Sequence, residues 1–317
     1  MVRVIYIGGL GRSGTTLLER ILGELPGVCA LGEVVHLWQR DLVDDERCAC
    51  GAAFSACAFW GAVGDAAFGG WSTVDTTRVR ELRATIERTR HIPRLAARRL
   101  PAPHAGLVTE YAGYYTRVYA AAAAVRDASL GGAAGSRAST VVDSSKHSAL
   151  AFCLRWAPEV DLRVVQLVRD SRGVAYSWTK TVRRPESDGQ EMTRYTPGRC
   201  ALLWNAHNAA FGLLRRRGTP VLRLRYEELL ADPAAAIRTV AHFADLDPGP
   251  LDFLRPGTVR LGTCHSAAGN PMRFATGEVP LRPDNAWRTA LPAGQRRLVG
   301  ALTSPLLTAY GYGKRQA

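Results

Sequence analysis

The sequence predicts an α/β protein with a mainly parallel central sheet that is flanked by helices on both faces. Short apolar runs alternate along the chain with longer segments of helical periodicity. The runs are continuously hydrophobic, which is typical of strands buried on both faces of a parallel sheet. A chain of 317 residues, 47% of them hydrophobic, supplies enough apolar material for one compact unit. We therefore predict a three-layer fold in a single domain over residues 1–317.

Four apolar runs are predicted strands, and most segments between them are predicted helices. The strands are expected at residues 2–7, 140–142, 162–168 and 221–224. Helices are expected at residues 15–25, 77–99 with a break at Pro93, 108–128, 173–181 and 200–217, with two more beginning near Tyr226 and Pro233. Glycine, proline or charged residues are frequent in residues 130–139, 183–199 and 247–292, which we expect to be irregular.

The charge of the chain favours an anionic ligand. The formal net charge is +13, and a positive field of this kind steers anions toward a protein. None of the usual nucleic-acid-binding motifs accompanies this charge in the sequence. The composition therefore predicts a polyanionic small molecule as the ligand and no nucleic-acid partner.

The sequence predicts a cytoplasmic protein without a membrane span. The longest uncharged apolar stretch, residues 118–125, is far shorter than the ~20 residues that cross a bilayer. The first residues offer no apolar segment of signal-peptide length. Seven cysteines, an odd number, fit reduced thiols better than a disulfide framework.

A glycine-rich turn between the first strand and the first helix predicts an anion-binding site. Backbone N–H groups of such a turn converge on an anion, and the helix N-terminus adds positive potential. The pattern departs from that of nucleoside triphosphatases, because Thr15 replaces the lysine that reaches the β and γ phosphates. A plain connecting turn is the alternative, but the nearby cation and paired threonines favour anion binding. The residues expected to bind the anion are Gly11, Arg12, Ser13, Gly14, Thr15 and Thr16.

A second motif, at residues 167–177, begins at the end of another predicted strand. Together with residues 11–18, it resembles the sulfotransferases that use 3′-phosphoadenosine 5′-phosphosulfate (PAPS). Residues 11–18 are similar to their 5′-phosphosulfate loop, with an arginine where the cytosolic branch has lysine. Arg169 and Ser177 keep the eight-residue spacing of the arginine and serine that hold the 3′-phosphate in that family. Taken alone, they would more often be a surface cation and a helix-face hydroxyl.

Two weaker motifs extend the resemblance toward the end of the chain. Tyr226 lies in a segment similar to the family's tyrosine-glutamate element, whose tyrosine contacts adenine. Residues 265–273 look like the late nucleotide-covering loop of bacterial members and contribute Asn270. Because the Arg-Lys-Gly triplet of the cytosolic branch is absent, the second 3′-phosphate cation is assigned to Arg273. The resemblance implies a P-loop NTPase-like fold and PAPS as co-substrate without a required metal. We also expect irregular or helical insertions near residues 44–104 and 183–199 to cover the acceptor pocket.

Sulfuryl transfer to a hydroxyl needs an aligned acceptor, a base and positive charge at the leaving phosphate. By resemblance to tyrosylprotein and several bacterial sulfotransferases, Glu33 is the expected general base. His36 is three residues further on and could act as the base or orient Glu33. The same resemblance makes Lys146 and Arg12 the cations for the leaving group. Lys146 follows a predicted strand, where α/β sheets bind ligands, although it could equally be an ordinary surface residue.

The predicted function is sulfuryl transfer from PAPS to a hydroxyl of a small-molecule, lipid or carbohydrate acceptor. One alternative is a P-loop kinase that uses magnesium and ATP, with Asp143 as a Walker-B-like magnesium ligand. The missing Walker lysine argues against it. The other alternative is a non-enzymatic, arginine-rich protein that binds nucleotides or nucleic acid.

A cysteine cluster at Cys48, Cys50 and Cys57 is a candidate metal site. It offers three thiols but lacks both the paired Cys-x₂-Cys spacing of zinc sites and an obvious fourth ligand. We therefore expect no metal, and a disulfide from Cys57 to Cys48 or Cys50 stays open.

Overall fold

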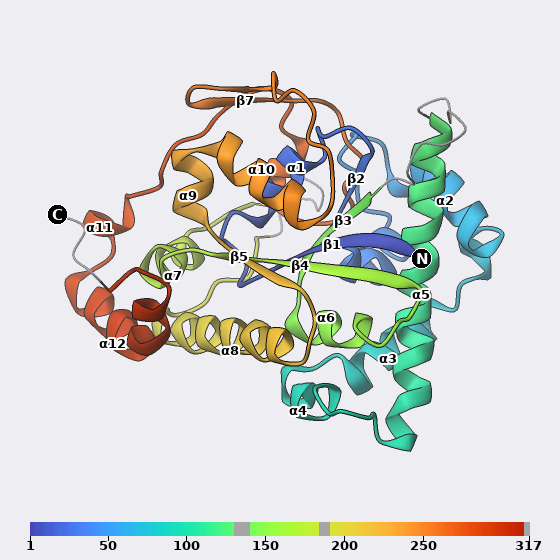
Figure 1. The fold of residues 1–317 in the computed structure, drawn as a ribbon, viewed down its shortest axis with the longest axis horizontal. Coiled ribbons are helices and arrows are strands. Elements are labelled where there is room, and N and C mark those ends of the chain that lie inside the picture. The colour runs from blue at the N-terminus through green and yellow to red at the C-terminus, as the bar shows by residue number, and fades with distance from the viewer. Residues whose placement is uncertain (130–139, 184–190, 314–317) are drawn as a thin grey trace.

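The centre of the fold is a five-stranded parallel sheet with the strand order β2-β3-β1-β4-β5. The computed structural model describes residues 1–129, 140–183 and 191–313. Figure 1 shows α1, α9 and α10 on one side of the sheet and α6 and α8 on the other. The strands are β1 (Val2–Gly8), β2 (Val28–Gly32), β3 (Thr140–Lys146), β4 (Val160–Val168) and β5 (Val221–Arg225). The predicted α/β class and parallel sheet are confirmed.

The helices connect the strands and cover the sheet. They are α1 (Thr15–Leu22), α2 (Ala58–Phe68), α3 (Thr76–Ile86), α4 (Ile92–Leu95), α5 (Ala102–Ser129), α6 (Ser148–Leu154), α7 (Ser171–Thr179), α8 (Pro197–Arg216), α9 (Tyr226–Ala231), α10 (Pro233–Phe243), α11 (Trp287–Ala290) and α12 (Ala293–Ala309). Short helical turns include η1 (Val34–His36), η5 (Thr89–His91) and η6 (Pro271–Phe274). No helix in the described part of the chain combines the length and the apolarity that crossing a bilayer requires.

Both faces of the sheet are buried, which explains why the strand sequences are continuously hydrophobic. On β1, Ile5 and Ile7 pack into the core beneath α1, α9 and α10. Val4 and Tyr6, which point the opposite way, pack into a second core formed largely by the insertion before β3, α6 and α8. The two cores fix the sheet between its helical layers.

The structure differs from the sequence prediction in several places, and the helices α2, α6 and α12 were not predicted. Residues 28–32 form β2, an unpredicted strand that contains glycine and alanine and only one β-branched residue. The predicted helix at 77–99 ends at Ile86, and Pro93 lies in the first turn of α4 rather than breaking a longer helix. The region predicted to be irregular, 247–292, contains the antiparallel strands β6 (Leu254–Arg255), β7 (Thr258–Leu261) and β8 (Gly277–Pro280), together with α11.

Two predicted loops can be compared only in part. The loop expected at 130–139 lies outside the described residues. Of the segment 183–199, the described part has a bridge between Arg183 and Glu191, and α8 begins at Pro197. Because all five strands of the main sheet are parallel, their carboxyl ends meet at one edge, and Gly8, Gly32 and Lys146 end three neighbouring strands there.

Candidate active site

A cavity of about 830 Å³ lies at the edge of the sheet where the strands end. Its size is in the range of small-molecule and cofactor sites. One part of the wall comes from residues that follow β1, β2, β3 and β5, and another from the connections after α3 and before α8. The predicted site residues that line it are Gly11, Arg12, Gly14, Thr15, Thr16, Glu33, His36, Lys146, Ser177, Tyr226 and Asn270.

The glycine-rich turn opens α1 toward this cavity. Gly14 has a φ of +90° and accepts a hydrogen bond from the Leu18 N–H at 3.0 Å, so it begins the helix. A Cβ atom at Gly14 would lie 2.5 Å from Cδ2 of Tyr226, so a side chain there would displace the tyrosine ring. Among the described residues no side chain caps α1. Its first N–H groups are therefore available to an anion in the cavity.

Arg12 is held at the mouth of the turn by aromatic and backbone contacts. Its guanidinium lies 5.5 Å from the ring centroid of Trp178, and Trp178 donates a hydrogen bond from Nε1 to the carbonyl oxygen of Gly11 at 2.8 Å. The Trp178 ring also stacks on Tyr195, with 4.4 Å between the ring centroids. Arg12 adopts a φ of +73°, a left-handed conformation that is costly for a residue with a side chain.

Arg169 directly follows the strand β4 and is almost completely buried beside the turn. Its Nη1 donates to the carbonyl oxygen of Arg12 at 3.2 Å, and its guanidinium lies 4.7 Å from the ring centroid of Tyr226. Its Nη2 donates to Oδ2 of Asp284 at 3.1 Å. Burial opposes ionisation of Asp284, but the hydrogen bond and charge of Arg169 and the charge of Lys180 lower the pKa of that carboxyl group. The fork of Arg169 is thereby positioned between the turn and the tyrosine.

Glu33, His36 and Lys146 form a compact group in the cavity wall. Nζ of Lys146 forms an ion pair with Oε1 of Glu33, and Nε2 of His36 lies 3.6 Å from the other carboxylate oxygen. Burial, followed by the charges of His147 and Arg83, lowers the pKa of His36 well below its ordinary value. The imidazole is therefore neutral near pH 7. A carboxylate with one oxygen on a cation and the other toward a neutral imidazole is a suitable proton acceptor.

Residues 265–270, here called the late segment, hold Glu33 in place. Within it, Ala267 donates a backbone hydrogen bond to Leu31 at 2.8 Å, and Ala268 accepts one from Glu33 at 3.2 Å. The approach is so close that a Cβ atom at Gly32, whose φ is +79°, would lie 2.4 Å from the carbonyl oxygen of Ala267. A Cβ atom at Gly269 would lie 3.0 Å from Oε1 of Glu33. The backbone of the late segment thus forms the floor beneath the carboxylate.

Lys146 reaches Glu33 through an unusual backbone conformation. It is the last residue of β3, has a φ of +68° and pairs with Gly8 after a shift in the strand register. The described non-glycine residues with positive φ are Arg12, Asp45, Lys146 and Asp245. Two of these four, Arg12 and Lys146, are cations that line the cavity, which agrees with the tendency of backbone strain to occur at functional sites.

A second ionic group in the cavity was not identified from the sequence. Oε1 of Glu87 lies 2.6 Å from Nδ1 of His147, and its other oxygen accepts a hydrogen bond from the Tyr111 hydroxyl at 2.5 Å. Burial opposes ionisation, but His147 and Arg83 lower the pKa of Glu87. Burial lowers the pKa of His207, which also lines the cavity, to about 4. The only sequence signal was that His147 follows Lys146 directly.

Like Arg169, three other residues considered from the sequence are not among the described residues that line the cavity. Ser13 is buried within the turn, and the cavity lining drawn from the described residues does not include it. The same lining omits Arg273, which is buried on η6, where Nη1 donates to the Ser266 carbonyl oxygen at 3.2 Å. Asp143 is fully buried and accepts hydrogen bonds from the Tyr119 hydroxyl and the Ser145 N–H at 2.5 and 2.7 Å. These contacts do not favour Asp143 as a magnesium ligand.

The parallel sheet with a glycine-rich turn at its carboxyl edge defines a P-loop-type α/β protein. A family model described as "Sulfotransferase family" matches residues 4–249, which extend from β1 to beyond α10. The chain belongs to the sulfotransferase family.

The comparisons also give individual relatives. Human carbohydrate sulfotransferase 3 is 28% identical over 173 residues, which are 49% of this chain and 34% of the human protein. The chain thus matches only about a third of the length of that relative. The sulfotransferase domain of the Synechococcus PCC 7002 olefin synthase aligns over 96% of this chain and 94% of its own, with 20% identity and a TM-score of 0.48. The sulfotransferase domain of the curacin biosynthetic pathway aligns over 96% and 98%, with 14% identity and a TM-score of 0.49.

Proposed function

We propose that the protein is an enzyme that transfers the sulfuryl group of PAPS to a hydroxyl of a small-molecule, lipid or carbohydrate acceptor. The observation that carries this proposal is that one cavity contains both the glycine-rich turn and the Glu33–Lys146–His36 group. The glycine-rich turn is suited to binding a phosphosulfate. The Glu33–Lys146–His36 group is suited to removing a proton from an acceptor next to that phosphosulfate. We further propose that the whole chain acts as one sulfotransferase domain.

The donor would lie along the turn and extend toward Tyr226. The backbone N–H groups of residues 11–16 would bind the 5′-phosphosulfate, with Thr15 and Thr16 contributing hydroxyl groups. Arg169 and Ser177 would bind the 3′-phosphate, since an arginine fork and a nearby hydroxyl can share the oxygens of one phosphate. The ring of Tyr226 would contact adenine, and Asn270 would cover the nucleotide. Arg273, which is buried on η6 outside the described cavity lining, is not included among these contacts.

In the proposed reaction, Glu33 accepts the proton of the acceptor hydroxyl as its oxygen forms a bond to sulfur. The bond between sulfur and the bridging phosphate oxygen breaks, and 3′-phosphoadenosine 5′-phosphate leaves with that oxygen. Lys146 and Arg12 stabilise the negative charge that develops there. His36, which is neutral, positions the carboxylate. No step in this scheme needs a metal at the reacting atoms.

The acceptor class and the compartment are proposed from two further observations. The name of the human relative, carbohydrate sulfotransferase 3, refers to carbohydrates, so glycan hydroxyls are the first acceptors to screen. All seven cysteines lie in the described ranges as free thiols, which supports a reducing, cytoplasmic compartment.

Thermal-shift measurements test the donor assignment. Saturating 3′-phosphoadenosine 5′-phosphate should raise the melting temperature without magnesium, because a ligand that binds only the folded state stabilises it. Stabilisation by magnesium-ATP alone would indicate a kinase, and stabilisation only by an oligonucleotide would indicate a nucleic-acid-binding protein. Transfer of label from [³⁵S]PAPS to a panel of glycan, lipid and small-molecule alcohols then tests the reaction. Failure to label any acceptor class while the donor binds would contradict the proposed hydroxyl acceptors.

A further inference from the structure

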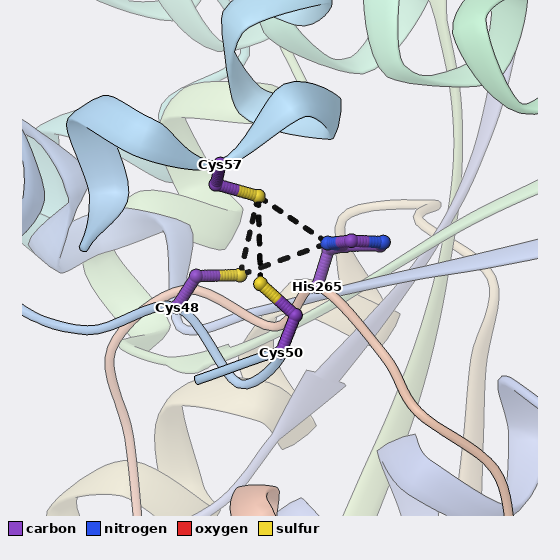
Figure 2. A group of neighbouring side chains, drawn as sticks. All are labelled: Cys48, Cys50, Cys57 and His265. Carbon is purple, nitrogen blue, oxygen red and sulfur yellow. Dashed lines mark hydrogen bonds between the residues drawn. The ribbon is translucent and has the colours of Figure 1, made fainter. Parts of the chain in front are cut away.

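Three cysteines and a histidine that are distant in the sequence meet in a cluster outside the cavity. Cys48, Cys50 and Cys57 come from the insertion before α2, whereas His265 begins the late segment. Figure 2 shows the three sulfur atoms and the imidazole nitrogen pointing toward one another. The four ligand atoms all lie within 4.8 Å of one another, and the lining of the active-site cavity, as the described residues define it, contains none of the four residues.

Four of the six separations between these atoms are close to the edges of a metal-centred tetrahedron. Zinc–sulfur bonds of about 2.3 Å and zinc–nitrogen bonds of about 2.0 Å imply edges of about 3.8 Å between sulfurs and about 3.5 Å from sulfur to nitrogen. Sγ of Cys57 lies 3.6 Å from that of Cys48 and 3.8 Å from that of Cys50. Nδ1 of His265 lies 3.3 Å from Sγ of Cys57 and 3.8 Å from Sγ of Cys48.

The same distances do not describe a disulfide. A disulfide joins its sulfur atoms at about 2.05 Å, whereas all three thiols are free in the structure. The sequence predicted no metal because a fourth ligand was missing. His265, more than two hundred residues after Cys57, supplies that ligand.

The contacts around the cluster hold its backbone and the imidazole ring of His265 in place. Cys48 and Cys50 lie in a tight turn in which the Gly51 N–H donates to the Cys48 carbonyl oxygen at 2.9 Å. The ring of His265 stacks on that of Phe59, with 4.9 Å between centroids and 17° between planes. Nε1 of Trp60 donates to the His265 carbonyl oxygen at 2.8 Å, so the backbone on both sides of the cluster is held. A preformed donor set of this kind lowers the cost of binding a metal.

We propose that Cys48, Cys50, Cys57 and His265 bind one zinc ion in a tetrahedral site. Three thiolates and one imidazole are a donor set of structural zinc sites, and four protein ligands leave no open position for a substrate. Binding of Zn²⁺ releases the protons of those thiols that are still protonated. The ion would join the segment before α2 to the late segment. In the late segment, Ala267 and Ala268 form backbone hydrogen bonds with Leu31 and Glu33.

Metal analysis of the full chain, purified from cells grown with zinc, tests the site directly. We expect one zinc ion per chain in the unaltered protein. Cys57→Ser and His265→Ala should each lose most of this zinc. Cys264→Ser is the matched control, because Cys264 is the sequence neighbour of His265 and lies outside the cluster. Cys264→Ser should retain one zinc ion per chain. A loss of zinc as large as that in Cys57→Ser would overturn the assignment.

Cobalt substitution of the unaltered chain keeps the proposal testable even if the cysteine variants fail to fold. Co²⁺ added to metal-free protein should give thiolate-to-cobalt charge-transfer bands and the d–d bands of a tetrahedral centre. Zn²⁺ should abolish these bands and raise the melting temperature. Two results would overturn the proposal. One is that Co²⁺ gives none of these bands although all seven cysteines still react as free thiols. The other is that the mass of the intact chain is lower by two hydrogens, which would indicate a disulfide. Neither readout depends on sulfuryl transfer, so a failure here is distinct from a failure of the proposed function.

Discussion

The carboxylate of Glu33 has a cation on one oxygen and a neutral imidazole near the other. Glu33→Gln keeps the size of the side chain but cannot accept a proton. Turnover should therefore fall by ~10²-fold or more, with the affinity for 3′-phosphoadenosine 5′-phosphate nearly unchanged. Steady-state rates and calorimetry on the variant give both quantities. His36→Asn is the companion variant, and near-normal turnover in Glu33→Gln with a large loss in His36→Asn would move the base to His36.

Arg169 is expected to act in binding rather than in chemistry. Arg169→Ala removes a buried guanidinium fork, so donor affinity should weaken by roughly 2 kcal/mol, or about 30-fold in Kd. Calorimetry with 3′-phosphoadenosine 5′-phosphate measures this change. Arg172→Ala is the control, because Arg172 pairs with Asp170 through Nη2 at 2.6 Å and extends over Trp287. Equal affinity in the two variants would contradict the placement of the 3′-phosphate.

Much of the candidate site could be predicted at the level of single residues, because its members belong to short motifs at strand ends. Parallel strands bring those ends together, so Arg12, Glu33 and Lys146 converge although they are far apart in sequence. Glu87 could not be predicted as a site residue, since it follows an arginine-rich helix and belongs to no recognisable motif. Its partner His147 is distant in the sequence, and only the packing of the folded chain brings the two together. His265 was missed as a partner of the cysteines for the same reason.

The turn before α1 depends on a glycine at one position. In Gly14→Ala the strain of a side chain at positive φ, roughly 1–2 kcal/mol, should lower stability. The new methyl group would also displace the Tyr226 ring, so donor affinity should fall by about tenfold or more, since base–aromatic stacking contributes about 1–3 kcal/mol. Gly27→Ala is the matched control, because Gly27 also has a positive φ, of +66°, and a Cβ there meets nothing within 4 Å. It should lose stability without losing donor affinity. Thermal melts on both variants measure the loss of stability from strain, and calorimetry measures the loss of donor affinity from the contact with Tyr226. Equal donor affinity in the two variants would contradict the role of Tyr226.

Helices and strands could be predicted where the hydrophobic pattern of the sequence is strong. The prediction failed where contacts with other parts of the chain determine the conformation. The strands β1 and β4, rich in valine and isoleucine or leucine, were predicted almost to their ends. The strand β2 was missed because its sequence, Val-Cys-Ala-Leu-Gly, has low strand preference and is held by β3 and the late segment. Similarly, β6 to β8 are short strands among prolines and glycines that pair only with one another.

Buried carboxyl groups should give the whole molecule a measurable pH dependence of stability. Burial raises the pKa of Glu19 from 4.5 to about 7. The native state therefore keeps a proton that the unfolded state loses between these values, so the free energy of unfolding falls as pH rises through this window. The contribution is complete below pH 4.5 and is lost above pH 7.

Glu19→Gln removes this titration and keeps an acceptor for the Gly32 N–H and the Ser266 hydroxyl. The stability of the variant relative to the unaltered chain should grow by up to about 3 kcal/mol between pH 4.5 and 7 and stay level beyond. Any cost of burying the new amide is independent of pH and does not change this trend. Denaturant unfolding at several pH values measures it, and a constant difference would contradict a titrating Glu19.

The late segment is synthesised after all the strands of the parallel sheet. All five strands of the parallel sheet precede residue 226, whereas the backbone that supports Glu33 belongs to residues 265–270. A nascent chain that ends before residue 265 therefore contains every strand of that sheet and the glycine-rich turn, but not the backbone that supports Glu33. In a growing polypeptide, the turn and its sheet are thus synthesised before the segment that supports Glu33.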